Sequence, residues 1–450
     1  MPKWRCKICG YIHEGDAPPE LCPVCGAGED EFKIMEDLLK SSNRAEIGRI
    51  VIIGNGAAGI EAARTIREQN GSVEILILGE ESYPFYSRIH LSTFIGDASQ
   101  IRDITIFPEK WYDEQNITVR LETKIIDINT QKKQIIDEKG RIYSYDKLIL
   151  ACGAFPFLPP IAGVGKKGVF TLRNIKDALQ IRSAVKSCKV AAVIGGGILG
   201  IEAASSLNKL GINTTIIEIT DHLMHQQLDA AAASLLQKIL EQRGLSIRCP
   251  NKVEKLLGRR ELTGILLDNE ETIAATFALF STGIRPQIDI AKKAGLQTNQ
   301  GILVNENMQT SQADIFAAGD VAEYDDSLLG IWPAAVDQGI IAGLNALGIS
   351  SKYSATAPLH ILKVAGIEMT AVGQKSRIDP KDKEIVHLDD MNFQYVKLIH
   401  NSQILKGAVV LGIRGIGFRL ERLIKKQTPI DHLLKDLEKF NWEILKKKKS

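Results

Sequence analysis

The sequence lacks any long apolar run, and its charges nearly cancel. No stretch reaches the roughly 18 uninterrupted apolar residues that a membrane-spanning helix needs, and the opening Met1 to Cys6 lacks the apolar core of a secretion signal. The 56 basic and 54 acidic residues leave a formal net charge of +2, which predicts neither a nucleic-acid surface nor an acidic binding tail. We therefore expect a cytoplasmic protein with no membrane or nucleic-acid partner.

Cysteine is scarce as well, and it is unevenly placed. The chain has seven cysteines, and none occurs between Cys25 and Cys152. Four of them form two CxxC pairs near the N-terminus, separated by twelve residues: Cys6, Cys9, Cys22 and Cys25. In a cytoplasmic chain such a cluster predicts a metal rather than disulfides, and four thiolates on two tight turns form a closed tetrahedral site.

The metal is not decided by this spacing, because zinc ribbons share it. The CPxCG form of the second pair and the aromatic residues Trp4, Tyr11 and Phe32 favour iron. Residues 1–34 resemble the short rubredoxin domains of rubrerythrins, including Trp4-Arg5-Cys6 and the acidic stretch that ends at Phe32. The resemblance implies a rubredoxin-type iron centre, with zinc as the alternative, and the polar residues 36–48 are expected to form a linker on which this domain could swing.

A glycine fingerprint follows an apolar strand that begins at Arg49. The strand, a Gly54-x-Gly56-x-x-Gly59 turn, a helical pattern and a second strand from Val73 to Leu78 occur in the order of a βαβ unit. Such a turn places a helix N-terminus against a pyrophosphate, and an acid about twenty residues on binds the ribose. We expect this first nucleotide site to use Gly54, Gly56, Ala57, Ala58, Gly59 and Glu80, with Glu81 as the competing acid.

The same unit recurs about 140 residues later, which suggests two nucleotides rather than one. Its second strand, expected from Thr214 to Ile217, leads into Glu218, and a carboxylate there binds the 2′-hydroxyl of NADH but repels the 2′-phosphate of NADPH. The following residues offer no arginine for that phosphate, so NADH is favoured. We expect the NAD site to use Gly195, Gly197, Gly200, Glu218 and Gly283.

Further motifs carry a family resemblance. The strand ending in Ala151-Cys152-Gly153, the segment Ala313 to Asp320 and the segment Trp332 to Gly339 look like three consecutive motifs of pyridine-nucleotide-dependent flavoproteins. The resemblance implies FAD in the first site, with Ala151, Gly153, Gly319 and Asp320 among its contacts. Within that superfamily, Pro84 to Arg88 is most similar to NADH:rubredoxin reductases and to the N-terminal half of assimilatory nitrite reductases.

The implied fold class is α/β, with two Rossmann-like FAD- and NAD-binding domains of the glutathione-reductase type. A small rubredoxin-like metal domain would precede them, and an α+β interface domain would follow, offering a surface on which a homodimer could form. The expected boundaries are 1–35 for the metal domain, 36–48 for the linker, 46–161 with 274–350 for the FAD domain, 162–273 for the NAD domain and 351–450 for the interface domain.

The redox thiols of this superfamily are missing. The chain has neither the CxxxxC pair of the disulfide reductases nor the CxxC pair of the small thioredoxin reductases. A dithiol relay is therefore unexpected, and no catalytic residue is certain. Arg88 is a candidate for a cation near the flavin, and its alternative is an ordinary surface salt bridge.

With no thiol route, the attached metal is the expected electron exit. A flavin takes two electrons from NADH and can release them singly, as a single iron requires. The resemblance implies an external acceptor protein such as a rubredoxin, a flavodiiron protein, rubrerythrin or superoxide reductase, in oxidative-stress defence. The alternatives are a nitrite reductase-like reductase component, or an NADH oxidase whose N-terminal module is a zinc ribbon that docks a partner.

Overall fold

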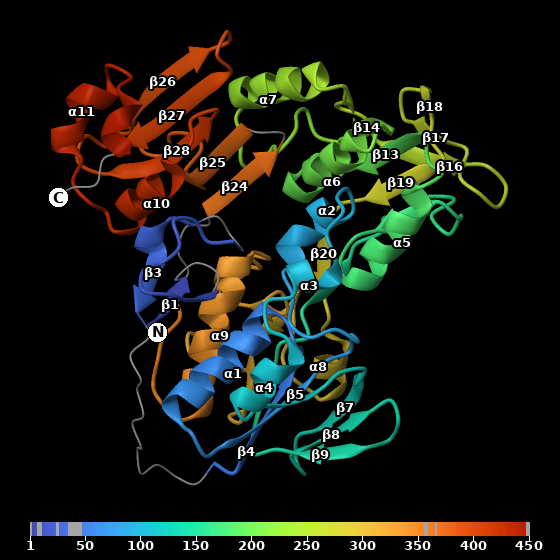
Figure 1. Ribbon diagram of the computed structural model, residues 1–450, viewed down its shortest axis with the longest axis vertical. Coiled ribbons are helices and arrows are strands. Elements are labelled where there is room, and N and C mark those ends of the chain that lie inside the picture. The colour runs from blue at the N-terminus through green and yellow to red at the C-terminus, as the bar shows by residue number, and fades with distance from the viewer. Residues whose placement is uncertain are drawn as a thin grey trace. The chain divides into compact units, whose positions relative to one another are not determined.

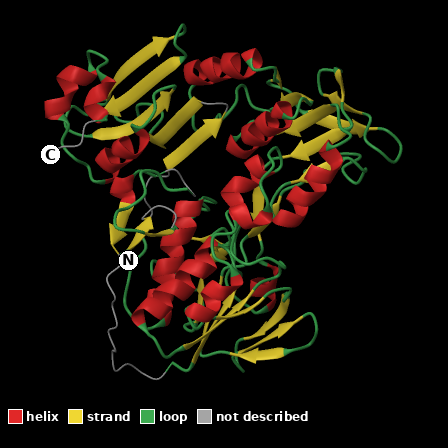
Figure 2. Ribbon diagram, viewed as in Figure 1, coloured by secondary structure: helices red, strands yellow, loops and turns green. Residues whose placement is uncertain are grey.

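The computed structural model describes most of the chain in two compact units (Figures 1 and 2). It describes residues 2–6, 11–23, 27–34, 47–354 and 367–446, together with the backbone of 359–364. The first unit comprises Met1–His90, Ser99–Phe155 and Ile284–Ala355, and the second comprises Leu91–Ala98, Pro156–Gly283 and Thr356–Ser450. No helix within the described ranges has the length and apolar character needed to cross a bilayer.

The first unit begins with a small antiparallel sheet of order β2-β1-β3. A short 3-10 turn, Glu29–Glu31, leads into its third strand. Strand β1 is central, pairing Arg5 with Ile12 on one side and with Lys33 on the other. The strand bounds are β1 Lys3–Cys6, β2 Ile12–Glu14 and β3 Phe32–Ile34.

The main sheet of the first unit is parallel, with strand order β22-β10-β4-β5-β6. Its central strands are apolar after their charged first residue, as strands buried on both faces must be. Ile50 and Ile52 of β4 contribute to one core cluster, and Val51 and Ile53 contribute to another. The bounds are β22 Ile315–Ala317, β10 Lys147–Leu150, β4 Arg49–Ile53, β5 Glu74–Leu78 and β6 Thr118–Arg120.

Helices α1 (Ala57–Gln69) and α9 (Trp332–Ala346) pack together in the core cluster that contains Ile50 and Ile52. Their backbones approach so closely that only glycine fits on α9. A methyl carbon on Gly339 would lie 2.3 Å from the carbonyl oxygen of Ala58, and one on Gly343 would lie 2.8 Å from that of Ala62. This contact joins the first fingerprint helix to a segment almost 300 residues further along the chain.

Smaller elements complete the first unit. They comprise an antiparallel sheet of order β7-β8-β9, two short strand pairs and short helices. Their bounds are η2 Arg88–His90, α3 Ile101–Ile104, α4 Glu109–Glu114, β7 Ile125–Asn129, β8 Gln134–Asp137, β9 Ile142–Ser144, β11 Ala154–Pro156, β20 Ile284–Pro286, α8 Asp289–Lys293, β21 Ile302–Leu303 and β23 Ala322–Glu323.

The second unit contains another five-stranded parallel sheet, with strand order β12-β19-β13-β14-β15. The sheet strands are β12 Val169–Thr171, β19 Phe277–Phe280, β13 Val190–Ile194, β14 Asn213–Ile217 and β15 Ser246–Arg248. The helices of this part are α2 Leu91–Phe94, α5 Ile175–Val185, α6 Ile198–Lys209 and α7 Ala230–Gln242, and its antiparallel strands are β16 Val253–Leu257, β17 Gly264–Leu267 and β18 Thr272–Ala274. Two parallel sheets with crossover helices confirm the expected α/β class with two Rossmann-like folds.

The C-terminal part of the second unit is an antiparallel sheet of order β24-β25-β28-β27-β26 followed by helices. Leu420 and Leu437 of the helices share a core cluster with Val396, Leu398 and Val410 of the sheet. The bounds are β24 Leu359–Val364, β25 Ile367–Gly373, β26 Lys383–Asp389, β27 Gln394–His400, β28 Leu405–Leu411, α10 Gly417–Lys425, α11 Asp431–Leu437 and η3 Trp442–Leu445.

Candidate functional site

The first glycine of each fingerprint is held against the neighbouring strand of its sheet. Gly54 has φ +116°, and a methyl carbon on it would lie 2.1 Å from the carbonyl oxygen of Ala151. Gly195 has φ +115°, and a methyl carbon on it would lie 2.3 Å from the carbonyl oxygen of Ser281. Both turns therefore require glycine for the same two reasons, a left-handed backbone and a close carbonyl.

The third glycines also match. A methyl carbon on Gly59 would lie 2.0 Å from the carbonyl oxygen of Gly54, and one on Gly200 would lie 2.0 Å from that of Gly195. Each glycine thus lets its helix start directly against the fingerprint turn. The two fingerprints, far apart in sequence, have equivalent local geometry.

The second glycines face open space. No atom lies within 4 Å of a methyl carbon placed on Gly56 or on Gly197. These glycines are the N-caps of α1 and α6, and neither helix has a side chain that caps its first turn. Uncapped helix N–H groups beside an open glycine are the arrangement that binds a pyrophosphate. The residues present therefore fit one dinucleotide at each turn.

The other expected FAD residues lie at the same edge of the first sheet as Gly54. Strands β22, β10 and β4 are adjacent, and their carboxyl ends lead into Gly319, Ala151 and Gly54 respectively. Gly319 has φ +81°, and its N–H donates to Gln338 Oε1 of α9 at 2.8 Å. Asp320 follows it directly. Ligands bind at this edge of parallel sheets, and the roles of these residues stay predictions.

Glu218 follows β14 and is buried against the second fingerprint. Its Oε2 accepts the Gly196 N–H at 2.6 Å, and its Oε1 accepts the N–H and the hydroxyl of Thr220 at 2.8 and 2.9 Å. The carboxylate therefore lies beside the turn that would hold the pyrophosphate. This is the position from which an acid discriminates a ribose hydroxyl from a phosphate. Gly283, also expected here, follows β19 with φ +98°.

The first site differs at the equivalent position. The residue directly after β5 is Gly79, and the acids come one and two residues later. Glu80 pairs with Lys124 at 2.7 Å, and both side chains are half exposed. Glu81 pairs with Arg88 and accepts the Tyr86 hydroxyl at 2.6 Å. Arg88 thus has an acidic partner, while the choice between Glu80 and Glu81 for the ribose stays a prediction.

Tyr112 and Asn55 form a contact at the first fingerprint that the sequence motifs do not predict. The Tyr112 hydroxyl, on α4, donates to Asn55 Oδ1 at 2.9 Å and accepts the N–H of Phe85 at 3.0 Å. This orients the Asn55 amide within the Gly54–Gly56 turn. Asn55 Nδ2 is shielded from solvent and has no hydrogen-bond partner. A spare amide donor in this turn suits an anionic ligand, and no motif flags Tyr112, 57 residues away.

A second unforeseen pair lies in the second unit. Glu202 is on α6, two residues after the third glycine, and its Oε2 accepts the Ser92 hydroxyl of α2 at 2.7 Å. Burial raises the pKa of Glu202 to about 7, against the opposing effect of the Ser92 hydrogen bond. The acid is thus poised to titrate near neutral pH, unlike an exposed glutamate.

The surroundings of Cys152 disfavour a reactive thiolate. Its Sγ contacts the carbonyl oxygen of Gln287 at 3.4 Å, and burial raises the pKa of its thiol to about 12. The reactive form of cysteine is the thiolate, which this environment disfavours. The expected lack of a dithiol relay stays a prediction.

The two described cysteines of the N-terminal cluster, Cys6 and Cys22, make equivalent backbone hydrogen bonds. The Cys6 N–H donates to the Tyr11 carbonyl at 2.8 Å, and the Cys22 N–H donates to the Ala27 carbonyl at 2.7 Å, both across five residues. Both cysteines are buried. The matching hydrogen bonds suit Cys6 and Cys22 as the first ligand of each CxxC pair in a four-thiolate site. Cys9, Cys25 and linker residues 36–46 lie outside the described residues.

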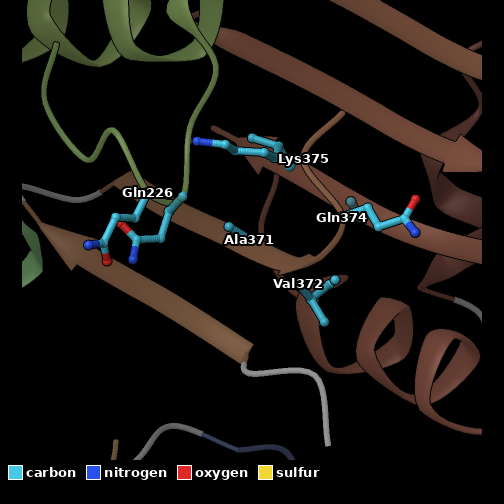
Figure 3. Close-up of a pocket in the computed structure, with 9 residues that line it drawn as sticks. Gln226, Ala371, Val372, Gln374 and Lys375 are labelled. Carbon is cyan, nitrogen blue, oxygen red and sulfur yellow. The ribbon is translucent and has the colours of Figure 1, made fainter. Parts of the chain in front are cut away.

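The hollow in Figure 3 is not where this chemistry lies. It measures about 120 Å³ and is formed between Gln226 with Gln227 and the segments around Ala371, Lys375 and Val409. Its lining is small and apolar apart from amides and one lysine. Across the described parts of the chain, no three His, Cys, Asp or Glu side chains gather as a metal site.

Family models match three segments. Residues 48–339 match the pyridine nucleotide-disulphide oxidoreductase model, residues 4–33 match the rubredoxin-like domain of rubrerythrin, and residues 358–428 match the C-terminal domain of rubredoxin NAD⁺ reductase. The three matches follow one another in the order that the motifs suggest. They support FAD and NADH as the cofactors of the central part.

Individual known proteins resemble this chain in agreement with the family matches. The chain is 35% identical to a nitrite reductase [NAD(P)H] of Bacillus subtilis over 86% of its own length, but it spans only 48% of that enzyme. It is 35% identical to an NADH oxidase of Methanocaldococcus jannaschii, covering 72% of this chain and 76% of that one. The crystal structure of NADH:rubredoxin oxidoreductase from Clostridium acetobutylicum aligns with a TM-score of 0.72 at 29% identity, covering 87% of this chain and 99% of that one.

A match over nearly 300 residues therefore coincides with the segment that holds both equivalent glycine turns. The chain belongs to the pyridine nucleotide-disulphide oxidoreductase family.

Proposed function

We propose that the chain oxidises NADH and passes the electrons, by way of FAD, to a rubredoxin-type iron held by Cys6, Cys9, Cys22 and Cys25. From there they go to a separate acceptor protein. The observation that carries the proposal is the duplicated fingerprint geometry, which supplies two dinucleotide cradles in one chain. One cradle serves a fixed flavin and the other serves an exchangeable nicotinamide.

The described residues have separate roles in binding the two nucleotides. Gly54, Gly56 and Asn55 bind the FAD pyrophosphate, and Gly197 with the first turn of α6 binds that of NADH. Glu218 selects the unphosphorylated ribose. Bound FAD supplies the conversion between a hydride and single electrons. The raised pKa of the Cys152 thiol, about 12, favours its protonated form, so Cys152 is not expected to compete for those electrons.

The acceptor is inferred from relatives rather than from the site. One relative is named NADH:rubredoxin oxidoreductase, and residues 358–428 match the C-terminal domain of rubredoxin NAD⁺ reductase. Together they support a small electron-transfer protein as the partner, with a rubredoxin, flavodiiron protein, rubrerythrin or superoxide reductase as candidates. Because the chain spans about half of the nitrite reductase that it matches, nitrite reduction would need further domains.

One experiment tests metal, flavin and internal transfer together. Metal analysis and a visible spectrum are recorded on the purified protein before and after anaerobic addition of NADH. We expect one iron per chain, a flavin band, and bleaching of both the flavin and the iron–thiolate bands. Cys22→Ser is the matched control, which should lose the iron band and keep the flavin response. Zinc in place of iron, or an iron band that NADH leaves unchanged, would overturn the proposal.

A second candidate is an NADH oxidase with a docking zinc module. It is favoured by the 35% identity to an NADH oxidase across most of that relative. Cys22→Ser separates the candidates, because an oxidase would consume oxygen at an unchanged rate. Reduction of a one-electron acceptor protein would collapse in the same variant only if the metal is the electron exit.

A further inference from the structure

A row of alternating charges joins the N-terminal module, the expected metal domain of residues 1–35, to helix α1. Arg5 of β1 forms an ion pair with Glu61 of α1, whose other carboxylate oxygen accepts from Arg64 Nη1 at 2.7 Å. Glu68 completes the row, with an oxygen 3.5 Å from Arg5 Nη1 and another 3.7 Å from Arg64 Nη2. One carboxylate is thus bridged by two guanidinium groups that come from different parts of the chain.

These charges are buried. The exposed fractions of the Arg5, Glu61 and Arg64 side chains are 8%, 3% and 3%. Lys3 and Glu14, another ion pair of the same module, are more than half exposed. A buried charge is tolerated only with a well-placed partner, whereas an exposed pair contributes little. The Arg5–Glu61 contact therefore selects one orientation of the module.

The three residues on α1 have the spacing of a single helix face. Positions 61, 64 and 68 are three and four residues apart, so their side chains share one side of the helix. Glu61 lies four residues after Ala57, or about 6 Å along the axis from the helix start. The face that meets the module is thus about one turn from the glycine turn.

We propose that this face of α1 is a docking site for the chain's own N-terminal module, with Arg5–Glu61 as its specific contact. Arg5 immediately precedes Cys6, so docking holds one expected metal ligand beside α1 instead of leaving the module on a free tether. The docking itself does not depend on the metal. Its use, the delivery of electrons within one molecule, rests on the function proposed above.

Carboxyl footprinting tests the docking without any electron transfer. The full-length holoprotein is labelled with a carbodiimide and an amine, and the modification rate of Glu61 is read by mass spectrometry. In the wild type Glu61 should be protected. In Arg5→Gln its rate should rise by about tenfold or more, because removing one partner of a buried pair strongly weakens a contact. Lys3→Gln, which breaks the exposed pair, should leave the rate unchanged.

Two further measurements make the result decisive. Arg5→Lys keeps the positive charge and should restore part of the protection, which a merely misfolded Arg5→Gln module would not predict. Protection in the wild type should also be independent of protein concentration. Equal labelling of Glu61 in the wild type and Arg5→Gln would overturn the proposal, as would protection lost on dilution, which would assign the module to a second copy.

The electron-transfer consequence has its own readout. After rapid mixing with NADH, the iron band of Arg5→Gln should bleach about tenfold more slowly than that of Lys3→Gln. If the iron does not respond to NADH in any variant, the proposed function fails while the footprinting result stands. If footprinting fails and bleaching is normal in every variant, the docking fails and the function stands.

Discussion

Replacing Glu202 with glutamine should remove a loss of stability that the wild type suffers as the pH rises. Burial raises the pKa of Glu202 from 4.5 to about 7 in the folded state. Because the folded chain holds this proton more tightly than the unfolded chain, the contribution of Glu202 to stability is complete below pH 4.5. It is lost as the pH rises through about 7. Glutamine mimics the protonated acid and cannot ionise.

The magnitude follows from the interval between the two pKa values. Each pH unit is worth about 1.4 kcal/mol, so the interval from 4.5 to about 7 corresponds to about 3.5 kcal/mol at most. Glu202 is only partly shielded from solvent, which brings the expected loss to about 1–3 kcal/mol. For a unit of 150–250 residues, this is a shift in melting temperature of about 3–10 °C.

Differential scanning calorimetry at pH 5, 6, 7 and 8 measures the effect as the variant minus the wild type, which cancels the titration of other groups. The excess of the Glu202→Gln melting temperature over that of the wild type should be smallest at pH 5, grow up to about pH 7 and level off by pH 8. The control is Glu254→Gln, an exposed acid of β16, whose difference should stay flat. A pH-independent difference for Glu202→Gln would refute the reasoning.

Three further predictions concern the two cradles. Gly56→Ala should fold normally yet retain less FAD, measured as the ratio of absorbance at 450 nm to that at 280 nm. Gly54→Ala should instead lose about 3 kcal/mol or more of stability, because its methyl carbon meets a carbonyl oxygen. Equal FAD content and stability in the two variants would contradict the assigned geometry. Glu218→Gln should raise the ratio of kcat/KM for NADPH to that for NADH about tenfold, by removing charge repulsion, and an unchanged ratio would remove Glu218 from cofactor selection. Tyr112→Phe should weaken FAD binding about fivefold, the worth of one hydrogen bond that orients Asn55, and unaltered FAD affinity in a titration of the apoprotein would count against that role.

Local patterns made the two nucleotide folds predictable. Each βαβ unit is encoded within a short stretch of sequence that holds an apolar strand and a glycine fingerprint, followed in the second unit by Glu218. The spacing of these features alone therefore predicts a βαβ unit. The strand predicted from Val73 to Leu78 begins at Glu74, and the one predicted from Thr214 to Ile217 begins at Asn213. One-residue differences are normal at strand ends.

The contacts that the sequence could not supply are those between distant residues. Ser92 and Glu202 are 110 positions apart, and Arg5 and Glu61 are 56 apart. No periodicity or spacing links such pairs, because tertiary packing alone brings them together. In the sequence Arg5 stands out only as part of the rubredoxin-like segment, whereas the charged residues on one face of α1 are a local sign of a contact surface.

The discontinuity of the first sheet has a consequence for biosynthesis. Strand β10 keeps an open edge until β22 is made, and α1 lacks its close-packed partner until Gly339 and Gly343 have emerged. The second parallel sheet, in contrast, has all its strands by Phe280. A nascent chain that ends near residue 300 would therefore carry one finished sheet and one unfinished sheet. Its uncovered strand edge is the part on which a ribosome-bound chaperone would act.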